Sequence, residues 1–172
     1  MTQSSITQSK AATKSSGASP TPRPEHGRLD VFVGKWSIKG KQYDGPFGPA
    51  AEISAVESYE WLVGGFFLIH RFGGRLDATE MACVEIIGYD DSSGSYPRYS
   101  FYSNGKTNEW QGHEGDGKWT LIGDSLVQDK SLKVRCTTVF SDSDKTMSGN
   151  WEYSSDGSTW QTFWDVVGTK AE

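Results

Sequence analysis

Turn-forming sequences interrupt this chain at short intervals from residue 29 to its end. Gly64-Gly65 and Asn104-Gly105 are typical of tight hairpin turns, and runs such as "GYDDSSGSY" and "SSDGS" supply further turns. The segments between the turns are rich in β-branched and aromatic residues, which favour strands. The pattern predicts about ten strands, at residues 35–44, 52–62, 66–72, 80–89, 97–103, 106–112, 118–123, 130–140, 146–154 and 159–169.

The short connections determine how these strands can pair. Consecutive strands joined by hairpin-sized loops form an antiparallel meander, and closing a long meander removes its exposed edges. No connection is long enough for the Greek-key crossings of a two-sheet sandwich. We therefore expect an all-β protein, a single antiparallel up-and-down β-barrel of about ten strands whose interior is filled by side chains or shared with one small ligand.

The chain before the first strand divides into two parts. Residues 1–26 are dominated by Ser, Thr, Ala, Lys and Pro, and such a segment cannot bury enough apolar surface to offset its ordering entropy. We expect a disordered leader there and a barrel domain over residues 27–172. Leu29 to Val33 is too short for a long helix and predicts a short helical turn that caps the barrel.

A tryptophan follows a glycine at the start of the first predicted strand. Gly34 allows close backbone approach, and Trp36 is expected to lay its ring across one end of the barrel. This Gly-X-Trp resembles the first-strand motif of the lipocalins and the wider calycin superfamily. Lys170, at the end of the last strand, resembles the basic residue that packs over this tryptophan in many calycins.

Longer segments resemble an uncharacterised bacterial family of lipocalin-like proteins, a domain of unknown function. The first, "ESYEWLVGGFFLIHRF", has a Trp, a Gly-Gly turn and a bulky apolar strand in the order of that family. Arg135 lies where the family has a characteristic Arg. The resemblance covers about residues 29–170 and implies the barrel fold, but no agreed activity. The segments that carry it are residues 57–72, 88–105, 117–124 and 133–144.

The net charge and the cysteine content limit which binding partners and which cellular location are expected. The net charge of −5, without a basic stripe, argues against nucleic acid and against an anionic membrane surface. Cys83 and Cys136, each in an apolar strand-like run, are expected to be buried and reduced. The N-terminus has no apolar stretch typical of a secretory signal, so a cytoplasmic location is expected. We predict no cofactor and no metal. The sequence leaves open whether the chain forms a homodimer.

The predicted strand 66–72 carries two basic residues on opposite faces. His70 shares one face with Phe66 and Leu68, and Arg71 shares the other, so one of the two basic groups points inward. We favour His70, because an imidazole is less costly to enclose than a guanidinium.

Two further charged residues interrupt apolar strands. Glu85 and Arg135 are as compatible with the outer face as with the interior, and we expect them to pair if both are inside. Four other acids are expected to be exposed partners of Lys and Arg: Glu57, Glu60, Glu109 and Glu152. Aromatic residues would complete the walls of one chamber. The candidate ligand-binding residues are His70, Glu85, Tyr102, Trp110, Arg135 and Trp151.

Three functions are compatible with these residues. The first is binding of a small, largely apolar or aromatic molecule in the barrel cavity. The second is an enzyme that cyclises or isomerises a small metabolite, with His70, Glu85 and Tyr102 as candidate groups. The third is a haem-binding calycin with His70 as axial ligand. Motifs of hydrolases and phosphate-binding loops are absent from the sequence.

Overall fold

The computed structural model describes residues 20–171, and ten strands make up most of this part of the chain. A short helix, α1 (Pro24–Gly27), leads directly into a 3-10 helix, η1 (Arg28–Phe32), which precedes the first strand. The strands are β1 (Gly34–Gln42), β2 (Ala51–Trp61), β3 (Phe67–Leu76), β4 (Thr79–Gly88), β5 (Tyr96–Tyr102), β6 (Thr107–Gly115), β7 (Lys118–Val127), β8 (Lys130–Ser141), β9 (Thr146–Ser154) and β10 (Gln161–Lys170).

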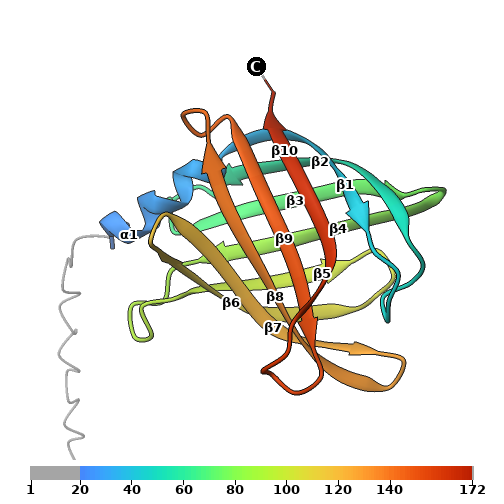
Figure 1. Cartoon of the computed structure of the whole chain (residues 1–172). Coiled ribbons are helices and arrows are strands. Elements are labelled where there is room, and N and C mark those ends of the chain that lie inside the picture. The colour runs from blue at the N-terminus through green and yellow to red at the C-terminus, as the bar shows by residue number, and fades with distance from the viewer. Residues whose placement is uncertain (1–19, 172) are drawn as a thin grey trace, which may run out of the picture.

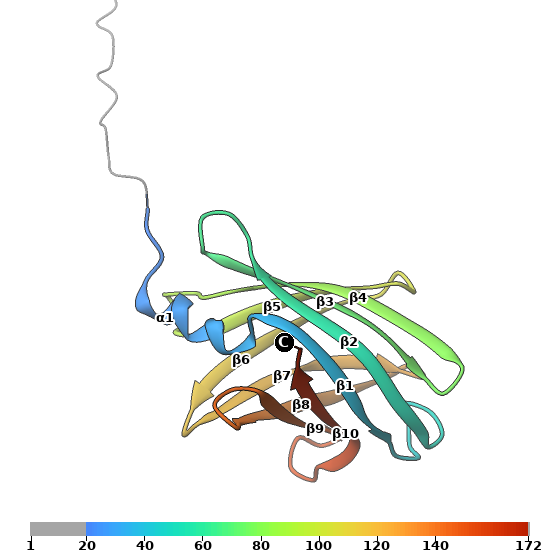
Figure 2. The ribbon, with the colours of Figure 1, turned by 90° about the horizontal axis from the view of Figure 1, so that it is seen from above.

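Each strand pairs antiparallel with its neighbours in the sequence, and β1 also pairs with β10, so the sheet closes into a barrel (Figures 1 and 2). The closing ladder runs from Trp36 opposite Lys170 to Gln42 opposite Trp164. Every strand therefore has a partner on both sides. The predicted all-β, up-and-down barrel of about ten strands is confirmed.

The predicted hairpin turns form where the sequence places them. Gly64 and Gly65 connect β2 to β3 with backbone φ values of +107° and +72°, a region that glycine enters without steric cost. β3 is longer than predicted, because it continues through Gly73 and Gly74 to Leu76. At Gly74 an added Cβ would lie 2.4 Å from the Cβ of Ala55 on β2, so only a glycine allows the two strands to approach this closely.

Trp36 closes one end of the barrel, as predicted. It has no exposed surface, and its indole Nε1 donates a 2.7 Å hydrogen bond to the carbonyl oxygen of Phe32 in η1. The Lys170 Nζ lies 5.1 Å from the centre of the indole ring. Gly34 has a φ of +126°, and an added Cβ would lie 2.9 Å from the Lys170 Cε. The lysine therefore covers the tryptophan in space that a side chain at position 34 would occupy.

The segment before β1 contributes to the same end of the barrel. η1 forms the predicted helical turn, and its Leu29 and Phe32 are buried in the cluster around Trp36. The helix α1 begins inside the predicted leader. Its His26 is buried, with ring centroids 5.4 Å from Phe66 and 5.6 Å from Tyr89. The rest of the predicted disordered leader, residues 1–19, lies outside the described residues.

Among residues 20–171, no helix is long and apolar enough to cross a membrane.

Trp36→Ala is expected to lower the free energy of unfolding by about 3–5 kcal/mol, because it removes a fully enclosed indole and leaves a cavity. Chemical denaturation followed by circular dichroism measures the change. Trp160→Ala is the matched control, since Trp160 is only half-buried and lies just before β10. Equal losses of unfolding free energy in the two variants would contradict the role of Trp36 as the residue that closes one end of the barrel.

Candidate functional site

The barrel encloses a chamber of about 430 Å³. Its walls come from every strand and are mostly apolar. One wall is aromatic, with Trp110 and Trp151 at 5.9 Å between ring centroids and Phe47 stacked on Phe163 at 4.2 Å. At the hairpin between β5 and β6 the lining includes the exposed Lys106, so the chamber reaches solvent at the end of the barrel opposite η1.

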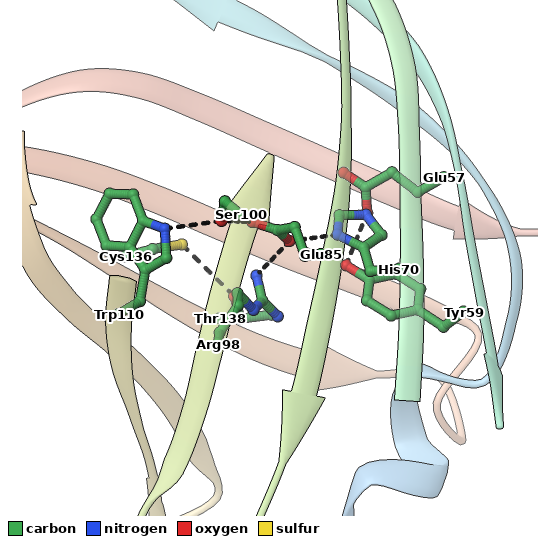
Figure 3. A network of polar contacts seen from close by, with 9 residues as sticks. All are labelled: Glu57, Tyr59, His70, Glu85, Arg98, Ser100, Trp110, Cys136 and Thr138. Atoms are coloured by element: carbon green, nitrogen blue, oxygen red, sulfur yellow. Dashed lines mark hydrogen bonds and ion pairs between the residues drawn. The ribbon is translucent and has the colours of Figure 1, made fainter. Parts of the chain in front are cut away.

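A network of polar side chains lies inside this largely apolar chamber, and Glu85 of β4 is its centre (Figure 3). The Glu85 carboxylate accepts hydrogen bonds from the Nδ1 of His70 on β3 and, at 2.5 Å, from the Ser100 hydroxyl on β5. The Arg98 guanidinium forms an ion pair with it at 3.2 Å. Ser100 in turn accepts a 2.9 Å hydrogen bond from the Trp110 indole.

Strand pairing brings these side chains together. His70 lies directly opposite Glu85 in the β3–β4 ladder, and Glu85 lies directly opposite Ser100 in the β4–β5 ladder. Directly opposite residues point to the same face of a sheet, and the face here is the interior. Arg98 is two residues before Ser100 and therefore shares its face.

His70 is held from several sides. The ring of Tyr59 on β2 stacks on the imidazole, with the centroids 4.1 Å apart and the planes 5° from parallel. The His70 Nε2 lies 3.6 Å from a carboxylate oxygen of Glu57, and this same oxygen accepts a 3.0 Å hydrogen bond from the Tyr59 hydroxyl. The imidazole thus lies between two carboxylates, with an aromatic ring over one face.

These neighbours shift the pKa values of both Glu85 and His70. Burial favours an uncharged Glu85, but Arg98, His70 and the hydrogen bonds from His70 and Ser100 outweigh it and lower the pKa of Glu85 from 4.5 to about 2. Burial also favours a neutral His70, but Glu85, through its charge and its hydrogen bond to Nδ1, and the nearby Glu57 carboxylate raise its pKa above the ordinary 6.5. The network therefore stabilises a carboxylate facing an imidazolium.

Two donor nitrogens of this network have no hydrogen-bond partner among the described residues. They are the Nε2 of His70 and the Nε of Arg98, both buried. An unpaired buried donor is costly, so an acceptor supplied by water or by a ligand would stabilise the site.

Five of the six candidate residues lie where the sequence analysis expected them. His70, Glu85, Tyr102, Trp110 and Trp151 all line the chamber. The inward choice of His70 over Arg71 agrees with the structure, since His70 is 4% exposed and Arg71 pairs with Glu60 on the outer face.

The expectation that Arg135 faces the chamber is wrong. Its neighbours Val134 and Cys136 in β8 line the chamber, so the strand alternation directs Arg135 outward. There its Nε donates a 2.6 Å hydrogen bond to Glu152, and its guanidinium carbon lies 4.1 Å from the centre of the Trp160 ring.

The sequence analysis missed Arg98 and Ser100 and misplaced Glu57, which is inside the barrel and not exposed. The period of two in "YPRYSFY" is the signal that could have found the first pair. Tyr96, Arg98, Ser100 and Tyr102 alternate with outward residues along β5. Aromatic residues on both faces of this strand obscured the pattern.

The two cysteines are free, with Cys136 buried and Cys83 half-buried. Burial, first of all, raises the pKa of each thiol to about 12, so both remain protonated and weakly nucleophilic at neutral pH. Within residues 20–171, no group of three or more His, Cys, Asp or Glu side chains is placed to hold a metal ion.

A haem site would require His70 to offer an unprotonated ring nitrogen to iron. The nitrogen left for iron, Nε2, is buried 3.6 Å from a carboxylate oxygen of Glu57, and the ring of Tyr59 covers one face of the imidazole. Two carboxylates favour the imidazolium, which has no lone pair to give. His70 therefore does not fit the role of an axial ligand.

A closed antiparallel barrel, plugged by a tryptophan and built around an internal chamber, defines a lipocalin-like protein. The chain belongs to the family described as "Protein of unknown function (DUF1579)", whose sequence profile matches residues 21–167. The match begins before α1, so the segment that caps the barrel is part of the family's domain.

The fold is similar to that of solved structures, and one of them is a mycobacterial protein. The crystal structure of Rv2717c from M. tuberculosis superposes with a TM-score of 0.61, at 13% sequence identity, over 87% of this chain and 99% of that one. At this identity the similarity shows the fold alone. A comparison with curated proteins found no match.

The ionisation of Glu85 predicts an acid-sensitive fold. A carboxyl group with a lowered folded-state pKa stabilises the fold above its unfolded pKa, near 4.5, and this stabilisation is lost as the pH falls towards about 2. Relative to Glu85→Gln, which does not titrate, the unchanged protein is expected to lose about 3 kcal/mol of unfolding free energy over that range.

Urea denaturation at a series of pH values measures this difference. Other acidic groups titrate in both proteins, so their contributions cancel in the comparison. Parallel stability curves for the two proteins would show that the pKa of Glu85 is not lowered by folding.

Proposed function

We propose that this barrel binds a small, largely apolar or aromatic molecule in its chamber. The observation that carries the proposal is the chamber itself, about 430 Å³ of space inside the barrel with mostly apolar walls. Ligand pockets in proteins are about 300–1,000 Å³, mostly apolar, with a few placed polar groups that orient the ligand. The network around Glu85 supplies such groups here.

The aromatic wall favours a flat ligand. Trp110, Trp151 and Phe163 present ring faces and edges from three strands, and Phe47 reaches them from the loop between β1 and β2. Aromatic pairs prefer edge-to-face and offset-stacked geometries, and a ligand ring can join such an arrangement with little rearrangement.

A second candidate function is acid–base catalysis on the bound molecule, as a cyclase or isomerase. One observation favours it. His70 is oriented by a carboxylate at Nδ1, the arrangement used by histidines that act as general acids or bases. Tyr102 is a weaker candidate acid, because burial and then the charge of Glu85 raise the pKa of its hydroxyl to about 12. Recovery of a bound ligand chemically unchanged after long incubation would contradict this second function.

The neutral, polarity-sensitive naphthalene dye Prodan is expected to bind at about one site per chain, with a blue-shifted emission, because the chamber is apolar and of suitable size. Fluorescence titration measures the stoichiometry and affinity. Cys83→Phe is expected to weaken binding at least about tenfold, since Cys83 lines the chamber and a phenyl ring would occupy the ligand space.

Val84→Phe is the matched control, since Val84 is the next residue of β4 and its side chain is 41% exposed on the outer face. It adds bulk to the same strand without entering the chamber. Equal loss of dye binding in both variants, or binding that neither affects, would contradict the proposed location.

A further inference from the structure

We infer that the chamber selects an uncharged ligand bearing a hydroxyl or carbonyl oxygen, and that it discriminates against the carboxylate of the same skeleton. This inference rests on the proposed function and specifies its ligand class. It follows from the charges that the chamber already contains and from how each of them is paired.

The four charged groups deep in the chamber balance one another. Glu57 and Glu85 carry two negative charges, and His70 and Arg98 carry two positive charges when the imidazole is protonated. The position of the imidazole between two carboxylates favours that protonated form. Were His70 neutral, the group would carry a net negative charge, and an anionic ligand would be opposed more strongly.

These charges interact strongly because they are enclosed. The side chains of His70 and Glu85 are 5% and 7% exposed, and those of Glu57 and Arg98 are each 14% exposed. Water screens such groups far less than it screens surface charges. A charge brought in by a ligand would therefore remain unbalanced.

Among residues 20–171, both cations in this part of the chamber already have their charge balanced by a carboxylate. The Arg98 guanidinium and the His70 Nδ1 both face Glu85, and the His70 Nε2 faces Glu57. A ligand carboxylate would lie beside two like charges. Lys106 also lines the chamber, but it lies at the exposed β5–β6 hairpin, where solvent weakens its effect.

A neutral oxygen fits the same place. The Arg98 Nε and the His70 Nε2 are buried donors without partners in residues 20–171, and a hydroxyl or carbonyl oxygen can accept from such donors. The carboxylate oxygens of Glu57 and Glu85 can accept a hydrogen bond from a ligand hydroxyl. Hydrogen bonding is thus available to an uncharged polar group without any change in the net charge.

The test is competition against bound Prodan by two matched compounds, 2-naphthylmethanol and 2-naphthoate, at neutral pH. The unchanged protein is expected to bind the alcohol more tightly than the carboxylate by at least about tenfold, because like charges in an enclosed site are strongly unfavourable. Glu57→Gln removes one negative charge and keeps an oxygen to accept the Tyr59 hydroxyl. In this variant, the ratio of the dissociation constants of 2-naphthoate and 2-naphthylmethanol is expected to fall by at least about tenfold, or the order of the two affinities is expected to reverse.

Glu60→Gln is the matched control, because Glu60 pairs with Arg71 on the outer face and its side chain is 62% exposed. It changes the net charge of the chain equally and is expected to keep the preference of the unchanged protein. The comparison of the two compounds on the unchanged protein stands even if Glu57→Gln does not fold.

The outcomes separate the inference from the proposed function. Tighter or equal binding of 2-naphthoate by the unchanged protein would overturn the inference, as would an unaltered preference in folded Glu57→Gln. Binding of Prodan without competition by the alcohol would also overturn it while leaving the chamber as a binding site. Absence of binding by the dye and both compounds would overturn the proposed function, and the inference with it.

Discussion

The ladder between β1 and β10 joins the two ends of the chain's only sheet among residues 20–171, and the chamber exists because this ladder closes. Its geometry depends on small residues at close contacts. At Gly40 of β1, opposite Val166 of β10, an added Cβ would lie 2.1 Å from the backbone oxygen of Asp165 and 2.8 Å from the Val166 Cα. Any larger residue there would push apart the two strands that complete the barrel.

Closure also produces two different interiors in one barrel. Near η1, Trp36, Leu29 and Phe32 pack into one buried cluster, and Leu29 and Phe32 form part of the chamber wall. Farther along the same strands, the side chains leave about 430 Å³ unfilled. The charged network borders this unfilled space, where its ion pairs are enclosed but two of its donors have no partner within residues 20–171. Such an arrangement is poor as a purely structural core, since apolar side chains would stabilise it better. It is well suited to orienting a ligand.

The fold was largely predictable from the sequence, because its signals are local. Dipeptides such as Asn104-Gly105 determine where the chain turns, and short connections leave antiparallel neighbours as the simplest pairing. Gly34 and Trp36 indicated the plug for the same reason, since a close backbone approach and a bulky ring are properties of single residues. The added length of β3 was not predictable, because Gly73 and Gly74 suit a turn as well as a strand that packs closely on β2.

The site was only partly predictable, because the sequence alone determined which residues can carry charge but not which charges meet. His70 and Glu85 were recognisable as polar groups in apolar strands. The partner of Glu85, however, is Arg98 and not Arg135, and Glu57 lies inside the barrel. Inward or outward direction changes with every residue, so it depends on the register between strands. That register, fixed by the closed barrel as a whole, decided that two acids and two bases share one chamber.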